Sequence, residues 1–437
     1  MGSTLAEWGT TFRVWAPHAD TVHVVGSFNG WDTARHPLAS EHNGFWSADI
    51  PEARAGDRYK FVLSGPHLDG PTWRNDPWAV LLTNSAGDSL ITEADVAAPV
   101  ENYRTPPWNE LVIYELHVGT FNVDPNYRGG RGNFDTVIAK LDYLRDLGVT
   151  AIELMPTDEF PGDISWGYNP SYAFAVEESY GGPRGLARLI EAAHRRGIAV
   201  IIDVVFNHLG PADLDMWRYD GWHGDPDGGP NAAPNAGMGG GVWFYNDWRA
   251  QTPWGNTRPD YGRGEVRSYL HDAALRWLEQ RGCDGLRWDA TGWIRNVWGN
   301  TGGPDSDLPD GWSLMQWINR DKRDRQPWKI SIAEDMSGAA AITAPPEQGG
   351  AGFDAQWAAT FVHGIRDLAA HPDDAGRSMF QLAFLLGLRP GEGAFSRVLY
   401  TESHDEVAAE SGQLRLPQQI SPGGDGADRW ARKRSTL

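Results

Sequence analysis

The stretch Gly285-Leu-Arg-Trp-Asp-Ala-Thr291 has the pattern of a buried strand that ends in charged residues. Leu286 and Trp288 form its apolar part, and because side chains alternate faces along a strand, Arg287 and Asp289 point together to the other side. In a parallel α/β barrel, catalytic groups gather at the carboxyl ends of the strands. Asp289 is therefore a candidate nucleophile that Arg287 keeps ionised, and a purely structural ion pair is an equally open alternative.

The same kind of unit recurs on both sides of this stretch. Apolar strand patterns alternate with segments that carry apolar residues at helical spacing, which is typical of a parallel sheet. The length of 437 residues favours a closed (β/α)8 TIM barrel over an open sheet. The predicted strands are Leu111–His117, Thr150–Leu154, Ile198–Phe206, Gly285–Trp288, Lys329–Ala333, Gly352–Trp357 and Val398–Thr401, and the predicted helices are Asn133–Leu147, Leu186–Arg196, Glu265–Gln280 and Ser313–Asp321.

The barrel pattern occupies residues 109–437 and stops before an eighth strand. Asp428–Leu437 has the pattern of a helix that begins, and no further strand pattern follows it. Because an unclosed barrel leaves strand edges unpaired, we expect a fragment that lacks the C-terminal part of its barrel and has little activity alone. A stretch rich in glycine, proline and tryptophan, 209–261, forms a predicted insertion after the third strand.

Residues 1–98 follow a different pattern, with short alternating runs broken by turn residues. The runs are Thr11–Trp15, Thr21–Val25, Gly44–Ala48 and Arg58–Val62. Such spacing predicts a small antiparallel β-sandwich of immunoglobulin-like type. The prolines between Val96 and Trp108 indicate a linker to the barrel.

The composition narrows the class of partner. The chain has 38 basic and 58 acidic residues and a net charge of −20, which argues against nucleic acid or an anionic membrane as a partner and favours a neutral or cationic ligand. Its single cysteine cannot form an internal disulfide. The first residues lack the pattern of a signal peptide, and no apolar run is long enough to span a membrane. We therefore expect a cytoplasmic protein, and the oligomeric state stays open.

Tryptophan is frequent, with 22 residues, and indole rings stack on the apolar faces of sugars. Most of these side chains are expected in the core. The predicted insertion contains Trp243, Trp248, Trp254 and Tyr261. A sugar platform and a loop core are equally consistent with them.

Four of the predicted barrel strands end in carboxylate and imidazole groups. These strand ends are Asp203–His208, Arg287–Asp289, Ala333–Asp335 and Ser403–Glu406. Because desolvated like charges destabilise a fold, four such strand ends together indicate a functional site.

In order and in strand placement, these four segments resemble the four signature regions of the α-amylase family of retaining glycosidases and transglycosylases, and the resemblance extends over about 111–407. The resemblance implies that Asp289 is the nucleophile, Glu334 the general acid/base, and Asp405 the carboxylate that binds sugar hydroxyls and stabilises the transition state. It also implies that the same subsite is lined by Tyr168, His208, Arg287 and His404. This chemistry requires no metal and no cofactor.

The implied mechanism sets a geometry. Retention of configuration requires the two catalytic carboxyl groups about 5 to 5.5 Å apart, a separation that neighbouring strand ends supply. The roles also require opposite protonation. We expect Arg287 to keep Asp289 ionised, and the carboxylates near Glu334 to raise the pKa of that side chain.

The turn Gly26-Ser-Phe-Asn-Gly-Trp31 resembles the glycogen-binding-type sandwich at the front of glucan branching enzymes. We expect this sandwich mainly to pack against the barrel, and glucan binding by it stays open. The expected ligand of the whole chain is an α-glucan or a maltooligosaccharide cleaved at an α-1,4 bond.

The acceptor of the reaction is less well defined by the sequence. Two segments, Tyr114–Thr120 and Ser403–Val407, favour a 1,4-α-glucan branching enzyme. Three others, Ile152–Pro156, Tyr172–Val176 and Asn207–Pro211, favour a hydrolase that releases trehalose from maltooligosyl trehalose. Trp288 and Asp335-Met336 depart from the usual family pattern and leave hydrolysis by an α-amylase-type enzyme open. A glucan-binding protein that has lost catalysis is the alternative of another class.

Overall fold

The computed structural model describes residues 1–93, 100–224, 239–388, 393–408 and 414–420, so the helix start predicted at 428–437 lies outside the described residues. The chain forms two compact units, Met1–Lys329 and Ile330–Leu437. The first unit contains the N-terminal strands together with four parallel strands and their helices.

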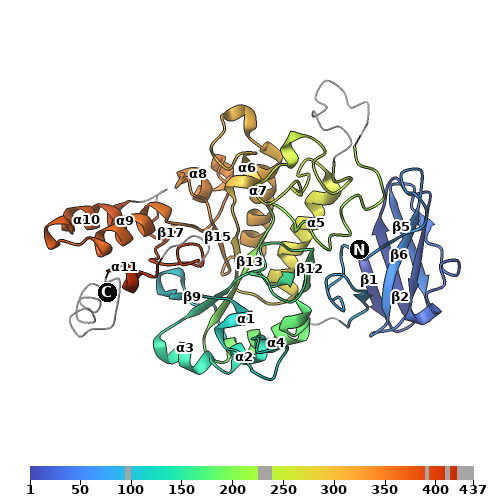
Figure 1. The fold of residues 1–437 in the computed structure, drawn as a ribbon, viewed down its shortest axis with the longest axis horizontal. Coiled ribbons are helices and arrows are strands. Elements are labelled where there is room, and N and C mark those ends of the chain that lie inside the picture. Colours follow the sequence, from blue (N-terminus) through green and yellow to red (C-terminus); the bar gives the residue numbers. More distant parts are fainter. Residues whose placement is uncertain (94–99, 225–238, 389–392, 409–413, 421–437) are drawn as a thin grey trace. The chain divides into compact units, whose positions relative to one another are not determined.

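The N-terminal part of the first unit is an antiparallel sandwich, as predicted (Figure 1). Its core is aromatic, because the ring of Phe12 contacts the rings of Tyr59 and Phe61 at centroid distances of 5.0 Å and 6.4 Å. One sheet contains β1 (Gly2–Ala6), β2 (Gly9–Trp15), β5 (Phe45–Ile50) and β4 (Ala39–Ser40) in that order, and the other contains β3 (Thr21–Gly26), β6 (Arg58–Ser64) and β7 (Thr72–Arg74), with β8 (Ser89–Leu90) also paired to β6.

The sandwich packs against the insertion that follows the third barrel strand. The indole ring of Trp15 contacts that of Trp243 edge-to-face at 5.1 Å, and the Arg74 side chain donates to the main-chain oxygen of Tyr219 at 2.9 Å. The predicted packing role of the sandwich is therefore confirmed, and glucan binding by its other surfaces is a separate question.

The first unit also contains four parallel strands in the order β9, β10, β13, β14. Their bounds are Ile113–Leu116, Ala151–Leu154, Ala199–Val204 and Gly285–Trp288, and β14 coincides with its prediction. Every residue of β10, β13 and β14 is buried, as is usual for parallel strands that are covered on both faces. The register of the last pair places Asp203 opposite Arg287, so that two charged side chains meet on one face.

Two of the predicted helices are divided in the structure. The segment 133–147 forms α2 (Phe134–Ile138) and α3 (Leu141–Leu147), because the amide of Lys140 bonds to the carbonyl of Val137, three residues back, and tightens the turn between them. The segment 265–280 forms α5 (Gly264–Leu275) and a π-helical turn. The other helices of this unit are α1 (Val118–Phe121), α4 (Gly182–His194), α6 (Gly292–Arg295) and α7 (Pro309–Arg325).

The second unit has three parallel strands, β15 (Ile330–Ala333), β16 (Ala355–Trp357) and β17 (Arg397–Val398). The predicted seventh strand was too long, since β17 can pair only where the three-residue β16 lies beside it. The helices of this unit are α8 (Ala340–Thr343), α9 (Ala359–Ala370), α10 (Met379–Gly387) and α11 (Leu416–Ile420).

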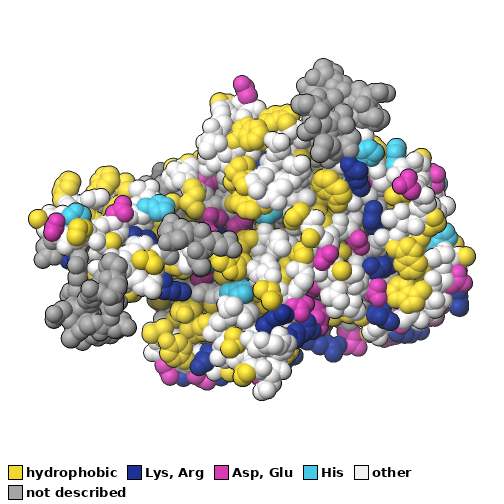
Figure 2. Space-filling view, in the orientation of Figure 1, with side chains coloured by type: hydrophobic (Ala, Val, Ile, Leu, Met, Phe, Trp, Pro, Cys, Tyr) yellow, Lys and Arg dark blue, Asp and Glu magenta, His cyan; other side chains and the backbone are white. Residues whose placement is uncertain are grey.

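Helices α9 and α10 of the second unit pack together around Phe361, Leu368 and Leu385. Met379 and Phe380, at the start of α10, are exposed. Figure 2 shows hydrophobic side chains at the surface where Figure 1 labels α9 and α10.

Both units therefore contribute parallel strands to the predicted α/β barrel class, and an eighth such strand does not occur among the described residues. Within the same described ranges, no helix is both long and apolar enough to cross a bilayer.

Candidate active site

The ends of β13 and β14 hold a buried charge cluster. Arg287 is completely buried, and one nitrogen of its guanidinium lies 2.6 Å from Oδ2 of Asp203 and 3.0 Å from Oδ1 of Asp289. The alternation of the strand brings Arg287 and Asp289 to one side, and the parallel register adds Asp203 from the next strand. The predicted pair of Arg287 and Asp289 is thus present, and a second carboxylate shares the same cation.

Asp289 is held at both carboxylate oxygens. Arg287 bonds Oδ1, and the side-chain amide of Asn207 donates to Oδ2 at 2.7 Å and to the main-chain oxygen of Asp289 at 2.9 Å. The next residue, Ala290, has a φ of 42°, a left-handed backbone that L residues rarely adopt and that is often found at functional sites. These contacts fix the orientation of the carboxylate.

The carboxyl group of Asp203 is almost completely buried. Burial raises its pKa to about 7, because the loss of water outweighs the opposing effect of Arg287, and the charge on Asp289 adds to the rise. The hydroxyl of Tyr168 donates to Oδ2 of Asp203 at 2.6 Å. Asp203 therefore links the predicted aromatic platform to the cation that holds Asp289.

His208 connects the main chain of Tyr168 to the side chain of Asn207. Its Nε2 lies 2.9 Å from the main-chain oxygen of Tyr168, and its Nδ1 contacts the side-chain oxygen of Asn207. Both ring nitrogens face oxygen atoms, which suits a protonated ring, whereas burial lowers the pKa of His208 to about 4. The neutral ring therefore donates to only one of the two oxygens.

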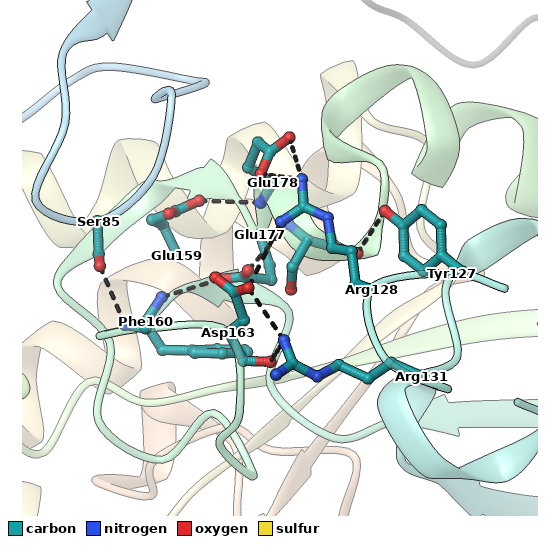
Figure 3. Close-up of polar contacts among 11 residues, drawn as sticks. Ser85, Tyr127, Arg128, Arg131, Glu159, Phe160, Asp163, Glu177 and Glu178 are labelled. Atoms are coloured by element: carbon teal, nitrogen blue, oxygen red, sulfur yellow. Dashed lines mark hydrogen bonds and ion pairs between the residues drawn. The ribbon is translucent and has the colours of Figure 1, made fainter. Parts of the chain in front are cut away.

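The segment that carries Tyr168 is anchored by buried carboxyl groups (Figure 3). It runs between β11 (Asp158–Glu159) and β12 (Tyr172–Val176). Oε2 of Glu177 accepts from the amide of Phe160 at 3.2 Å, and Oε2 of Glu159 accepts from the amide of Glu178 at 3.0 Å.

The protonation of these carboxyl groups differs from that of exposed glutamates. Burial, followed by the nearby charge of Glu177, raises the pKa of Glu159 to about 9, and burial raises the pKa of Glu177 to about 7. Neither acid was predicted from the sequence, since two glutamates that flank a pair of strands carry no spacing signal.

The remaining predicted residues lie in the second unit. Glu334 follows β15 directly and is buried. Asp405 has a side chain that is 54% exposed, with Nε2 of His404 at 3.4 Å from its Oδ1. The amide of Ser403 donates to Oε2 of Glu406 at 2.9 Å and thereby closes the turn that presents His404 and Asp405.

The structure thus brings Tyr168, His208, Arg287 and Asp289 together in the first unit, and it places Glu334, His404 and Asp405 in the second. The separation of Asp289 and Glu334, which belong to different units, stays a prediction. Within the described ranges, no group of three or more histidine, cysteine, aspartate or glutamate side chains has an arrangement that could hold a metal ion.

The aromatic residues of the insertion divide into two groups. Trp243 and Tyr261 are buried, so the loop-core interpretation is correct for them. Trp254 is exposed and stacks on the ring of His208 at a centroid distance of 4.6 Å and an interplanar angle of 14°. The insertion therefore reaches the charge cluster through Trp254, a contact that depends on loop conformation and that no sequence spacing indicates.

Comparison with protein families agrees with this geometry. Residues 120–342 match the catalytic domain of alpha amylase, and residues 1–79 match carbohydrate-binding module 48, described as the isoamylase N-terminal domain.

Individual relatives are identical to this chain at about a third of the aligned positions. A 1,4-alpha-glucan branching enzyme of Corynebacterium jeikeium is 31% identical over 473 aligned positions, which cover 100% of this chain and 59% of the relative. A malto-oligosyltrehalose trehalohydrolase of Saccharolobus solfataricus is 34% identical over 368 positions, which cover 84% of this chain and 56% of the relative. The chain thus spans somewhat more than half the length of these relatives.

A solved structure of a pullulanase from Paenibacillus barengoltzii has the same fold, with a TM-score of 0.71 and 21% identity over 100% of this chain and 71% of the pullulanase.

Proposed function

The chain belongs to the α-amylase family, and from this premise we propose that it acts in a retaining enzyme that cleaves α-1,4-glucosidic bonds, most specifically a 1,4-α-glucan branching enzyme. The observation that carries the proposal is the fixation of Asp289 by Arg287 and Asn207. A carboxylate that is held in one orientation, with donors on both oxygens, is suited to attack an anomeric carbon.

In the proposed reaction, an oxygen of Asp289 attacks the anomeric carbon of a glucose unit, and the bond from that carbon to the leaving oxygen breaks. Glu334 donates its proton to this oxygen, which departs as a hydroxyl of the released chain. Glu334, now a carboxylate, removes the proton of an acceptor hydroxyl, whose oxygen then displaces Asp289. Two inversions at the same carbon restore the original configuration.

The other residues bind and orient the sugar. The ring of Tyr168 offers an apolar face to the glucose unit, while its hydroxyl is engaged by Asp203. His404 and Asp405 would bind hydroxyl groups of the same glucose residue. The negative charge of Asp405 would also stabilise the positive charge that develops on this sugar in the transition state.

Transfer and hydrolysis differ in the acceptor that resolves the covalent intermediate. Several relatives with 31% to 34% identity are branching enzymes, which supports transfer to a sugar hydroxyl. The trehalohydrolase with 34% identity supports water as the acceptor and is the second candidate. Because all three predicted carboxylates are present, we rank a non-catalytic glucan-binding protein third.

One incubation separates the three candidates. A full-length version of the protein would be supplied with amylose, maltoheptaose and maltooligosyl trehalose, and the products would be analysed by NMR and chromatography. New α-1,6 linkages on amylose identify a branching enzyme, and free trehalose identifies the hydrolase. Binding without any turnover would leave the non-catalytic alternative and contradict the proposed mechanism.

We also propose that the sandwich binds glucan through Trp31 and Trp73. Their indole rings lie 5.9 Å apart at 33°, and Trp73 is exposed. The amide of Trp31 donates to the side-chain oxygen of Asn29 at 3.0 Å and to the main-chain oxygen of Gly26 at 2.9 Å, so the predicted turn holds its tryptophan in a fixed position. The match to carbohydrate-binding module 48 supports this role.

The proposed partner is therefore an uncharged α-glucan, which a protein with a net charge of −20 does not repel. We further propose a cytoplasmic location. The single cysteine, Cys283, supports it because this side chain is buried and free of disulfide bonds.

A further inference from the structure

Two exposed tryptophans, one in the insertion and one after α6, have no role in the proposed reaction. Trp248 is 39% exposed and Trp298 is 37% exposed, and their rings stack at a centroid distance of 6.2 Å with an interplanar angle of 28°. Trp248 lies in the insertion after β13, whereas Trp298 follows α6, so the pair joins two segments that are distant in sequence. An indole ring that is exposed to water does not gain the free energy that burial would provide. Two exposed indole rings side by side therefore indicate a binding surface.

The main chain beside each ring is held by specific polar contacts. The side chain of Asp247 accepts from the amide of Arg249 at 2.9 Å and caps the short helix that begins at Trp248. The amide of Trp298 donates to the side-chain oxygen of Asn296 at 2.8 Å, and its carbonyl accepts from the hydroxyl of Thr301 at 2.7 Å. Both rings are thus presented by ordered backbone, which lowers the entropy that a ligand would have to remove.

A buried arginine donates hydrogen bonds to both of the segments that carry the tryptophan pair. Arg258 is completely buried, and its guanidinium donates to the carbonyl of Arg249, next to Trp248, and to the carbonyl of Val297, next to Trp298, the latter at 2.9 Å. Keeping a guanidinium in the interior is costly, and here its planar fork fixes the spacing of two loops. Arg258 is therefore a positioning residue for the tryptophan pair.

The pair is continuous with the candidate active site. The carbon at the centre of the Arg258 guanidinium lies 5.9 Å from the ring of Trp293, and Trp293 contacts Trp254 edge-to-face at 5.8 Å. Trp254 in turn stacks on His208. Aromatic contacts therefore lead from His208 to Trp293, and Arg258 connects Trp293 to the backbone beside the exposed pair, within a single unit of the chain.

We propose that Trp248 and Trp298 form a second sugar-binding platform, which holds glucose units of the same α-glucan chain beyond those at the reacting bond. This inference rests on the proposed function. Two carbon contacts of about 3.5 to 4 Å would be needed to hold a sugar between the rings, so a spacing of 6.2 Å is too small and the sugar binds across their outer faces. The ligand is a chain long enough to span both the reacting bond and the platform.

The test compares long and short glucans. Binding of maltoheptaose, amylose and maltotriose would be measured by calorimetry. The background carries Asp289→Asn, so that turnover does not consume the ligand, and Trp31→Ala/Trp73→Ala, so that the sandwich does not contribute to the affinity. The double variant Trp248→Ala/Trp298→Ala is expected to bind amylose about tenfold more weakly, from the loss of stacking on two rings, and to bind maltotriose unchanged. Trp248→Phe/Trp298→Phe retains aromatic faces and should restore most of the affinity.

A matched control is available elsewhere in the same unit. Trp8 and Trp328 are 48% and 55% exposed, and Trp8→Ala/Trp328→Ala should leave the affinity for all three ligands unchanged. Equal amylose affinity in the platform variant and its parent would overturn the inference while leaving the proposed function intact. A loss for maltotriose as large as for amylose would also overturn it, because it would indicate disturbed folding of the loops. If the parent protein binds no glucan, the platform and the proposed function both fail.

Discussion

Two of the predicted catalytic carboxylates stand in very different surroundings. The side chain of Asp289 is 11% exposed, and both of its oxygens accept bonds from buried donors, whereas the side chain of Asp405 is 54% exposed and has His404 at 3.4 Å. The first is fixed before any substrate arrives, and the second is still largely hydrated. The difference indicates that the two acids perform different work.

A fixed carboxylate loses little entropy when it forms a bond, so Asp289 suits nucleophilic attack. A hydrated carboxylate must exchange water for sugar hydroxyl groups, so Asp405 contributes through binding, and its effect grows as the substrate excludes water. The substitutions below test this division, from the largest expected effect to the smallest.

The largest effect is expected for Asp289→Asn. In the full-length protein, removal of the nucleophile should lower kcat by at least ~10⁴-fold with little change in substrate affinity, because the amide cannot form the covalent intermediate. Steady-state kinetics on amylose, with mass spectrometry to exclude deamidation, would measure it. An Asp289→Asn variant that stays active without deamidation would remove Asp289 from the mechanism.

Asp405→Asn should cost less than the loss of the nucleophile. We expect kcat/KM to fall about 10²- to 10³-fold, through both kcat and KM, since a neutral amide still bonds to sugar hydroxyls but does not stabilise positive charge. Equal losses of kcat for Asp405→Asn and Asp289→Asn would contradict the distinction drawn between the two acids.

Tyr168→Phe tests the support of the buried cluster. The variant keeps the aromatic ring but removes the hydroxyl that donates to Asp203 at 2.6 Å, and a bond to a carboxyl group with a pKa of about 7 contributes about 1.5 kcal/mol near neutral pH. Activity should fall roughly tenfold or somewhat more, mainly in kcat. Glucan affinity as low as that of Tyr168→Ala would instead show that the hydroxyl is needed for the platform itself.

The smallest effect concerns stability. Glu159 and Glu177 have folded pKa values raised to about 9 and about 7, above the ordinary value of 4.5, so their protonated forms stabilise the fold. This contribution is complete below about pH 4.5 and is lost as the pH rises through 7 and then 9. The melting temperature should therefore fall over this range, and Glu177→Gln should reduce the fall.

Thermal unfolding of Glu177→Gln and of Glu178→Gln, measured between pH 4.5 and pH 9.5, provides the comparison. Glu178 is the matched control, because its carboxylate is paired with Arg128 at 2.6 Å nearer the surface. Identical pH profiles for the two variants would show that the Glu177 carboxyl group does not hold an extra proton in the folded protein.

The same contrast between fixed and loop-dependent features explains what the sequence could predict. The strand at Gly285–Trp288 was located because apolar and charged residues alternate along it, and the same alternation placed Arg287 beside Asp289. The hydrogen bond from Asn207 to Asp289 depends on how the chain turns after β13, which no local sequence pattern specifies.

The sequence also did not predict the breaks in regular structure. The apolar spacing is continuous through 133–147, so a single tightened hydrogen bond at Lys140 leaves no trace in it. Likewise, the length of β17 is limited by its short neighbour β16, a constraint imposed by another part of the chain. The stacking of Trp254 on His208 has the same origin, in the conformation of a long insertion.

The central claim is that Asp289 forms a covalent bond to the sugar, and trapping that bond tests it most directly. A fluorinated α-glucosyl fluoride slows the breakdown of the intermediate while its good leaving group allows the first step, so the adduct accumulates. After incubation and proteolysis, tandem mass spectrometry should locate one glucosyl adduct on Asp289. An adduct on another residue, or turnover of the reagent without any adduct, would contradict the account.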